Sequence, residues 1–173
     1  MSVTYRSAVP GDAEALAALG RTTFTETFGH LYSEANLAAF LENHSVERWR
    51  RETADPAFAI RLAEVEGRAV GYAALGPHSL PFEVTAPTIE LRQFYVLKPW
   101  HGQGIAPEMM RWVIGEARAR AAEELYLSVF TDNERARRFY ARYGFETVGT
   151  YHFMVGSHAD DDLVLRLRLK GCA

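Results

Sequence analysis

The sequence predicts an α/β (α+β) fold in which a mixed β-sheet is flanked by helices. Two strand patterns around a tight turn indicate an early antiparallel hairpin, whereas the later strand–helix–strand order favours parallel pairing. The composition, 48% hydrophobic and 24% charged, is ordinary for a globular protein. A chain of 173 residues can bury a proper core as one domain, so we expect a single domain over residues 1–173.

The first half of the chain is expected to begin with a strand, continue through helices and end in the hairpin. Expected strands are Val3–Ala8, Ala57–Val65 and Ala69–Leu75, the last two joined by the turn Glu66–Arg68. Asp12 is a typical N-cap, and apolar residues continue at helical spacing from there to Phe28. Shorter helices are expected over Glu34–Leu41 and Val46–Thr53, and Pro56 ends the second.

The second half alternates strands with helices. The strongest strand pattern is Thr88–Leu97, and Pro107 falls in the first turn of the next helix, where its missing N–H is tolerated. The remaining elements are the strand Leu125–Phe130, the helix Asn133–Tyr143 ended by Gly144, and the strands Phe145–Val155 and Asp162–Leu169. The acidic run Asp160–Asp162 is expected to form a turn before the last strand.

Charge and cysteine content argue against some functions. The formal net charge of −3 disfavours nucleic-acid binding, which needs a concentrated basic surface. The lone thiol of Cys172 cannot form an internal disulfide, which indicates a reducing cytoplasm. Met1–Arg6 lacks the pattern of a signal peptide and no apolar run approaches bilayer length, so we expect a cytoplasmic protein without a membrane partner. Exposed edge strands of a mixed sheet can pair between subunits, so the sequence is compatible with a homodimer.

A glycine-containing turn, His101–Ala106, follows the strongest strand and precedes a helix. Its glycines let the backbone approach a ligand, and the helix start offers unpaired N–H groups to an anion such as a pyrophosphate. A P-loop would need Gly-Lys-Ser/Thr at this point, but Gly104 is followed by Ile105. The dinucleotide fingerprint would need a third glycine, and it too is absent.

The segment Phe94–Ala106 resembles the acetyl-CoA signature of the GNAT superfamily of N-acetyltransferases, Gln/Arg-x-x-Gly-x-Gly/Ala. Gly104 and Ala106 match the signature, while His101 stands where Gln or Arg is usual, so its side chain is interpreted as solvent-exposed. The resemblance implies a mostly antiparallel sheet of six to seven strands with about four helices, and acetyl-CoA as co-substrate. The cofactor-binding residues it implies here are Phe94, Tyr95, Val96, His101, Gly102, Gln103, Gly104, Ile105 and Ala106.

A second segment, Asn133–Phe145, resembles the same family independently. The resemblance implies that Asn133 contacts the pantetheine arm and that the hydroxyl of Tyr140 protonates the leaving thiolate. A phenol with a pKa of about 10 is protonated at neutral pH and can act as such an acid. The arginines between Arg135 and Arg142 are interpreted as a solvated stripe, and nucleic-acid binding through them is the weaker reading.

Acetyl transfer also needs a neutral amine, and an amine with a pKa of about 10.4 must first lose a proton. Glu90 stands where the histone-acetyltransferase branch of the superfamily carries its base; an ion-paired structural glutamate is the equal alternative. Arg92 is expected on the same face of the strand by two-residue alternation, where pairing would make Glu90 a weaker base.

The acceptor is the least determined part of the function. Both ends of the chain resemble the PaiA-type polyamine acetyltransferases, which implies a small-molecule amine substrate held among aromatic and acidic residues. Candidate substrate-binding residues are Glu26, Phe28, His30 and Tyr32. An aminoglycoside, an amino acid, a peptide and a protein N-terminus stay open as acceptors. So does a non-catalytic acyl-CoA-binding regulatory module.

Overall fold

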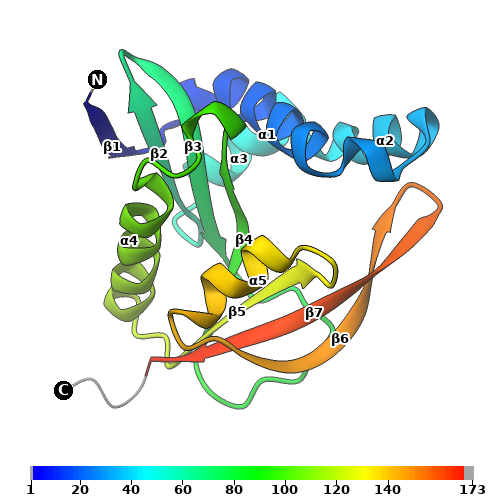
Figure 1. Ribbon diagram of the computed structural model, residues 1–173. Helices are drawn as coiled ribbons and strands as arrows, with labels where there is room; N and C mark the ends of the chain where they lie inside the picture. Colours follow the sequence, from blue (N-terminus) through cyan, green and yellow to red (C-terminus); the bar gives the residue numbers. More distant parts are fainter. Residues whose placement is uncertain (1, 170–173) are drawn as a thin grey trace.

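The computed structural model describes residues 2–169, so the expectation for Cys172 falls outside the described residues. Figure 1 shows one twisted sheet with helices on both of its faces. The strands are β1 (Val3–Ser7), β2 (Ala59–Val65), β3 (Arg68–Gly76), β4 (Thr88–Val96), β5 (Glu124–Phe130), β6 (Glu146–Val155) and β7 (His158–Arg168). The helices are α1 (Ala13–Phe28), α2 (Glu34–Leu41), α3 (Val46–Ala54), α4 (Ile105–Ala119) and α5 (Glu134–Ala141).

The sheet has seven strands in the order β1-β2-β3-β4-β5-β7-β6. Every neighbouring pair is antiparallel except β4 and β5, which are joined through α4. The mixed, mostly antiparallel sheet expected from the sequence is therefore confirmed. Within residues 2–169 the α-helices number five, in agreement with the figure of about four that the resemblance implied, and α2 and α3 are the two separate short helices expected from the sequence.

The parallel pair β4–β5 is short, and this positions the site. Pairing runs only from Thr88–Glu124 to Glu90–Tyr126, although β4 continues to Val96 and β5 to Phe130. Beyond Glu90 the two strands separate, as Figure 1 shows in the middle of the sheet. The sheet is thus open at its centre, on the side where β4 leads into the glycine turn.

Each face of the sheet carries its own apolar core. Helices α4 and α5 cover one face, where Met110 and Val113 of α4 pack with Leu125 of β5. Helices α1 and α3 cover the other, where Leu16 and Trp49 pack with the neighbouring strands. Because successive strand residues point to opposite faces, one strand such as β2 contributes to both cores.

Local sequence signals explain most element boundaries. The β2–β3 hairpin turns at Glu66 and Gly67, which both have positive φ (51° and 77°), the geometry of a tight hairpin turn. Ser33 and Ser45 cap α2 and α3 through their hydroxyls, which accept from backbone N–H groups at 3.2 Å. Asp12 precedes α1 but makes no capping bond to it. Its carboxylate instead accepts from Val9 N at 2.8 Å and pairs with Arg6.

The expectation of a turn at Asp160–Asp162 is wrong. These residues lie inside β7, and the chain turns earlier, at Gly156 (φ 60°) and Ser157. Consecutive aspartates are typical of solvated turns, but in this strand they alternate between surroundings. Asp160 and Asp162 are buried, whereas Asp161 is exposed and faces His152 at 3.1 Å. The β6–β7 pairing therefore carries two carboxylates into the interior.

The helix-to-sheet packing yields a stability prediction. Leu16 is 0% exposed in the core beneath α1, whereas Leu31 is 41% exposed. We expect Leu16→Ala to lower the free energy of unfolding by about 2–5 kcal/mol, because it removes apolar contacts and leaves a cavity. The same truncation at Leu31 should change it by less than about 0.5 kcal/mol. Urea unfolding of both variants checks this, and equal midpoints would contradict the assignment of Leu16 to the core.

Candidate active site

The turn between β4 and α4 has the geometry of an anion cradle. Gly102 and Gly104 both have positive φ (76° and 83°), and a Cβ at either position would meet nothing within 4 Å. The backbone there is therefore open to a ligand. Gly104 is the N-cap of α4, and no side chain caps this helix. The first N–H groups of α4 are left for an anion, whose charge the helix dipole also favours.

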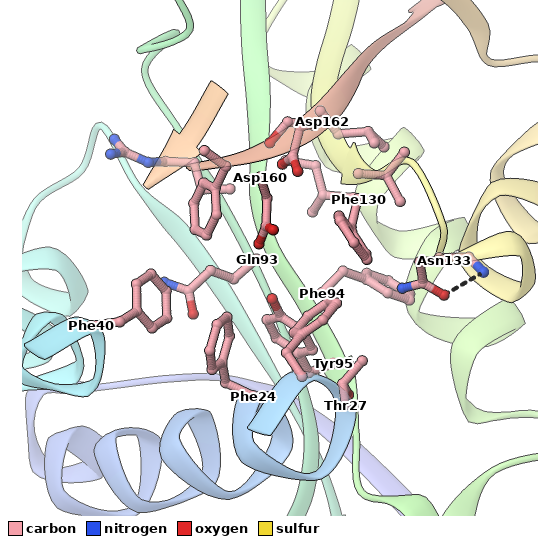
Figure 2. Close-up of a pocket in the computed structure, with 18 of the residues that line it drawn as sticks. Phe24, Thr27, Phe40, Gln93, Phe94, Tyr95, Phe130, Asn133, Asp160 and Asp162 are labelled. Carbon is pink, nitrogen blue, oxygen red and sulfur yellow. Dashed lines mark hydrogen bonds between the residues drawn. The ribbon is translucent and has the colours of Figure 1, made fainter. Parts of the chain in front are cut away.

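A cavity of about 390 Å³ lies over this turn, between the end of β4 and α5. All but one of the cofactor-binding residues predicted from the sequence line it. The exception is Gln103, whose exposed side-chain amide donates to the carbonyl of Pro99 at 3.1 Å. Asn133 also lines the cavity, and its Oδ1 caps α5 by accepting from Ala136 N at 3.3 Å, the dashed line in Figure 2.

His101 is not the solvent-exposed residue that the sequence suggested. It is half-buried, lines the cavity, and lies 2.7 Å from the carbonyl of Val96 through Nε2. Because a carbonyl can only accept, Nε2 carries the proton and Nδ1 is an acceptor. The guanidinium of Arg135 donates to that Nδ1. His101 thus holds an arginine of α5 at the cavity, a role that local sequence did not reveal.

The residues present fit coenzyme A. The helix start and the side chains of Arg135 and Arg142 offer N–H groups and positive charge to a pyrophosphate. The inner wall between Phe94 and Phe139 is apolar and suits the pantetheine arm. The cavity thus combines a basic mouth with an apolar interior, as an anionic ligand with a long neutral arm requires.

Tyr140 lies where this cavity meets a second one. Its side chain is 8% exposed and packs against the rings of Phe94, Phe139 and Phe145. Burial raises the pKa of Tyr140 above the ordinary value of a tyrosine, and the nearby Tyr95 adds to the effect. The phenol is therefore fully protonated at neutral pH. It lines both cavities, so it can contact ligands in each of them.

The second cavity, of about 400 Å³, occupies the opening between β4 and β5. Figure 2 shows its labelled residues, with Asp160 and Asp162 on one side and Phe24 and Thr27 of α1 on the other. Its carboxylates are Glu90, Asp160 and Asp162. Its aromatic residues are Phe24, Phe28, Tyr32, Phe40, Phe94, Tyr95, Phe130, Tyr140, Tyr151 and Phe153. Carboxylates among aromatic rings are a favourable environment for an organic cation.

The structure separates the predicted substrate-binding residues into two groups. Phe28 and Tyr32 line the second cavity. Glu26 and His30 are exposed and are not among its lining residues. On α1 the cavity face is set by helical periodicity, which places Thr27 and Phe28 toward the opening and Glu26 away from it. Neither Glu26 nor His30 is therefore in a position to contact a ligand in this cavity.

Glu90 lies in the second cavity but is bound to the loop before β4. Its side chain is 7% exposed, and Oε1 accepts from Ser79 N at 2.8 Å and from Ser79 Oγ at 3.0 Å. The expected partner Arg92 lies instead over the ring of Phe58, 5.4 Å from its centroid. Arg92 lines the same cavity as Glu90, as the alternation predicted, but its guanidinium is directed to Phe58 and not to the carboxylate. The β3–β4 ladder is irregular at this point, since Gln93 pairs with Ala74 but Leu91 pairs with Leu75.

Sequence reasoning missed two carboxylates of the cavity, Asp160 and Asp162. The hydroxyl of Tyr32 donates to Asp160, and His158 Nε2 lies 3.0 Å from its other oxygen. Burial raises the pKa of Asp162 to about 7, and the charge of Asp160 adds to the rise. The signal that could have found them is the two-residue spacing from Asp160 through Asp162 to the buried Val164, which is a strand pattern.

Comparison with known proteins decides the family. The sequence model of the Acetyltransferase (GNAT) family matches residues 18–145 of the chain. The chain belongs to this family. An uncharacterised N-acetyltransferase of Mycobacterium tuberculosis is 35% identical over 155 residues, which cover 89% of this chain and 96% of that protein. The resemblance predicted from the two motifs is thus confirmed.

Two solved structures of GNAT proteins have closely similar folds. The PaiA N-acetyltransferase of Thermoplasma acidophilum, in complex with coenzyme A, has a TM-score of 0.80 at 20% identity and covers 97% of this chain and 99% of that one. A ribosomal-protein-alanine N-acetyltransferase of Brucella melitensis has a TM-score of 0.73 at 28% identity, covering 95% and 99%. This GNAT chain is therefore an N-acetyltransferase with acetyl-CoA as co-substrate.

No helix within residues 2–169 is long and apolar enough to cross a membrane. The same residues contain no group of histidine, cysteine, aspartate and glutamate side chains that could hold a metal ion.

The glycine turn predicts the effect of a substitution on coenzyme A binding. Alanine in place of Gly104 is disfavoured at φ 83° by about 1–2 kcal/mol, and relaxing that strain would turn the N–H groups away from the pyrophosphate. We expect Gly104→Ala to weaken coenzyme A binding about tenfold or more. The matched control is Gly115→Ala in the same helix, where a Cβ meets nothing within 4 Å. Calorimetric titration with coenzyme A checks this; equal affinities for the two variants would contradict a cradle at Gly104.

Proposed function

We propose that this GNAT enzyme transfers the acetyl group of acetyl-CoA to a primary amine of a small cationic molecule, such as a polyamine, by direct attack. The observation that carries the proposal is the position of the carboxylate-lined aromatic cavity. It meets the coenzyme A cavity at Tyr140, and the two also share Phe94 and Tyr95 as lining residues. An acceptor amine in one cavity can therefore reach a thioester in the other.

The charges of the second cavity favour a cation. Its carboxylates are Glu90, Asp160 and Asp162, and its arginines are both held by other groups. Arg48 pairs with Glu52 at 2.9 Å, and Arg92 lies over Phe58. The negative charge of the cavity is therefore incompletely compensated, and aromatic faces next to it add cation–π attraction for an ammonium group.

Contacts around the cavity favour a small acceptor over a folded protein. Tyr32, just before α2, donates to Asp160 of β7. The side-chain oxygen of Asn36 in α2 accepts two hydrogen bonds from Ser157, one from the backbone N–H of Ser157 at 3.0 Å and one from its hydroxyl at 3.1 Å. These bonds join α2 to the β6–β7 hairpin beside the cavity and narrow the space left for an acceptor. A slender amine fits this arrangement better than a protein surface does.

Tyr140 is proposed as the general acid. When bound, acetyl-CoA supplies the acetyl group as a thioester. The neutral acceptor nitrogen forms its bond to the acetyl carbon, the carbon–sulfur bond breaks, and Tyr140 delivers its proton to the sulfur. The nitrogen then loses one proton to solvent to leave the amide, and a proton from solvent restores the phenol of Tyr140. Burial raises the pKa of Tyr140, which would disfavour this transfer in isolation. The same surroundings also disfavour a bare thiolate. Burial therefore raises the proton affinity of the departing sulfur as well as that of Tyr140.

The acceptor class is tested by turnover. We expect the purified enzyme to release coenzyme A thiol fastest with spermidine in a panel that also contains an aminoglycoside, free amino acids and an alanine-ended peptide. The rate at low spermidine should fall with added salt, because screening weakens attraction between the cation and the carboxylates. Turnover of the peptide alone would contradict the polyamine assignment and favour a peptide or protein N-terminus.

The role of Tyr140 is tested by removing only its hydroxyl. Tyr140→Phe should lower kcat by about 10²- to 10⁴-fold, because general acid catalysis is lost, while the Kd for coenzyme A stays within about twofold. Tyr143→Phe is the matched control, since Tyr143 is close by and contacts Phe139 but does not line either of the two cavities. Steady-state kinetics decide the matter, and an unchanged kcat in Tyr140→Phe would remove Tyr140 from the mechanism.

A further inference from the structure

We propose that Asp162 of β7, rather than Glu90 of β4, is the carboxylate that binds the acceptor's ammonium group and takes its proton. This inference rests on the proposed function and assigns a residue to the step that the family motifs leave open. It comes from a comparison of what already occupies each carboxylate in the cavity.

Glu90 is occupied by the loop before β4. Its Oε1 accepts two hydrogen bonds from Ser79, one from the backbone N–H and one from the hydroxyl, and its Oε2 lies 3.3 Å from the same hydroxyl. These bonds hold the segment between β3 and β4 against the sheet. A residue in this position fixes a wall of the cavity, and its oxygens face the protein's own donors.

Asp160 is also occupied. It accepts from the hydroxyl of Tyr32, and His158 lies within ion-pair distance at 3.0 Å. Its neighbour Asp161 is exposed and pairs with His152 at 3.1 Å. Both therefore have a partner that can carry positive charge.

Asp162 has no such partner. It is 5% exposed and lines the cavity, and it takes part in none of the ion pairs between the described residues. The hydroxyl of Ser128 on β5 is its hydrogen-bond partner, a neutral donor. A buried carboxylate without a cation is costly, so an ammonium group in the cavity would supply the missing charge.

The groups around Asp162 raise its pKa into the physiological range. Burial is the main cause of its raised pKa of about 7, Asp160 and Asp161 raise it further, and Ser128 lowers it. The other titratable groups that face it or line the same cavity are Tyr151 of β6, Tyr95 and Glu90 of β4, Tyr32 before α2, His44 before α3 and Tyr140 of α5. The cavity's arginines, Arg48 and Arg92, are held by Glu52 and Phe58.

The proton step balances within the cavity. An ammonium N–H bond breaks, its electron pair stays on nitrogen, and the proton forms an O–H bond on Asp162. A pair of opposite charges becomes a neutral amine and a neutral acid, and the burial of Asp162 favours that change. The proton later passes to solvent, which a carboxyl with a pKa near the working pH allows.

The pH profile of kcat/KM for spermidine, or for the best acceptor of the panel, tests the role. The wild-type enzyme should show an acidic limb with an apparent pKa near 7. In Asp162→Asn this limb should be lost and kcat at pH 7 should fall about 10²- to 10⁴-fold, while coenzyme A affinity is kept. Asp161→Asn, one residue away and exposed, is the matched control and should keep kcat and the limb, with the limb moved slightly to lower pH because one charge that raises the pKa of Asp162 is removed. Glu90→Gln should keep the limb.

The possible outcomes distinguish a failure of the role of Asp162 from a failure of the proposed acetyl transfer to an amine. If the wild-type enzyme acetylates no amine, the proposed function fails and the role of Asp162 fails with it. If it acetylates an amine and Asp162→Asn keeps the limb near 7, or Glu90→Gln loses it, only the role of Asp162 is overturned. If Asp162→Asn does not fold, Asp162→Glu replaces it and should retain a limb. Carbon-13 NMR of the wild-type aspartate carboxyls then decides, since titration of all of them below about pH 5 would overturn the proposal.

Discussion

The separation of β4 from β5 is the constraint on which the active site depends. Parallel pairing ends at Glu90 and Tyr126 although both strands continue, so backbone groups and side chains of the remaining residues are free to face ligands. The coenzyme A cavity and the acceptor cavity both form at this opening. The two apolar cores lie on opposite faces of the sheet. The candidate active site therefore depends on an interruption of the sheet.

The residues predicted for the cofactor side, Gln103 excepted, line one cavity because the determinants of their arrangement are local. The strand, the glycine turn and the helix start are contiguous, and Asn133 and Tyr140 follow within one short helix. The bounds of α2, Glu34–Leu41, were also predicted, since a serine cap and an apolar stripe define them within a few residues. In such segments the interactions that determine the structure lie within a turn or two of the residues themselves.

The acceptor side could not be predicted in the same way, because it depends on contacts between distant segments. Asp162 enters the cavity only because β7 lies between β5 and β6, a pairing between distant segments. Glu90 is held by Ser79 of the loop between β3 and β4, a partner eleven residues away that no local pattern indicates. The bond from Arg135 to His101 likewise joins two elements that are separated in sequence by α4 and β5.

The wall between the two cavities has a consequence for the evolution and redesign of acceptor preference. Thr27, Phe94, Tyr95, Asn133, Ala136 and Tyr140 line both spaces. A substitution at one of these positions changes the shape of both cavities, so it affects the binding of donor and acceptor together. Phe40 of α2 and Phe153 of β6 line only the acceptor space and contact each other at 5.4 Å between ring centroids. Exchanging that pair would reshape the proposed acceptor cavity without changing the lining of the coenzyme A cavity.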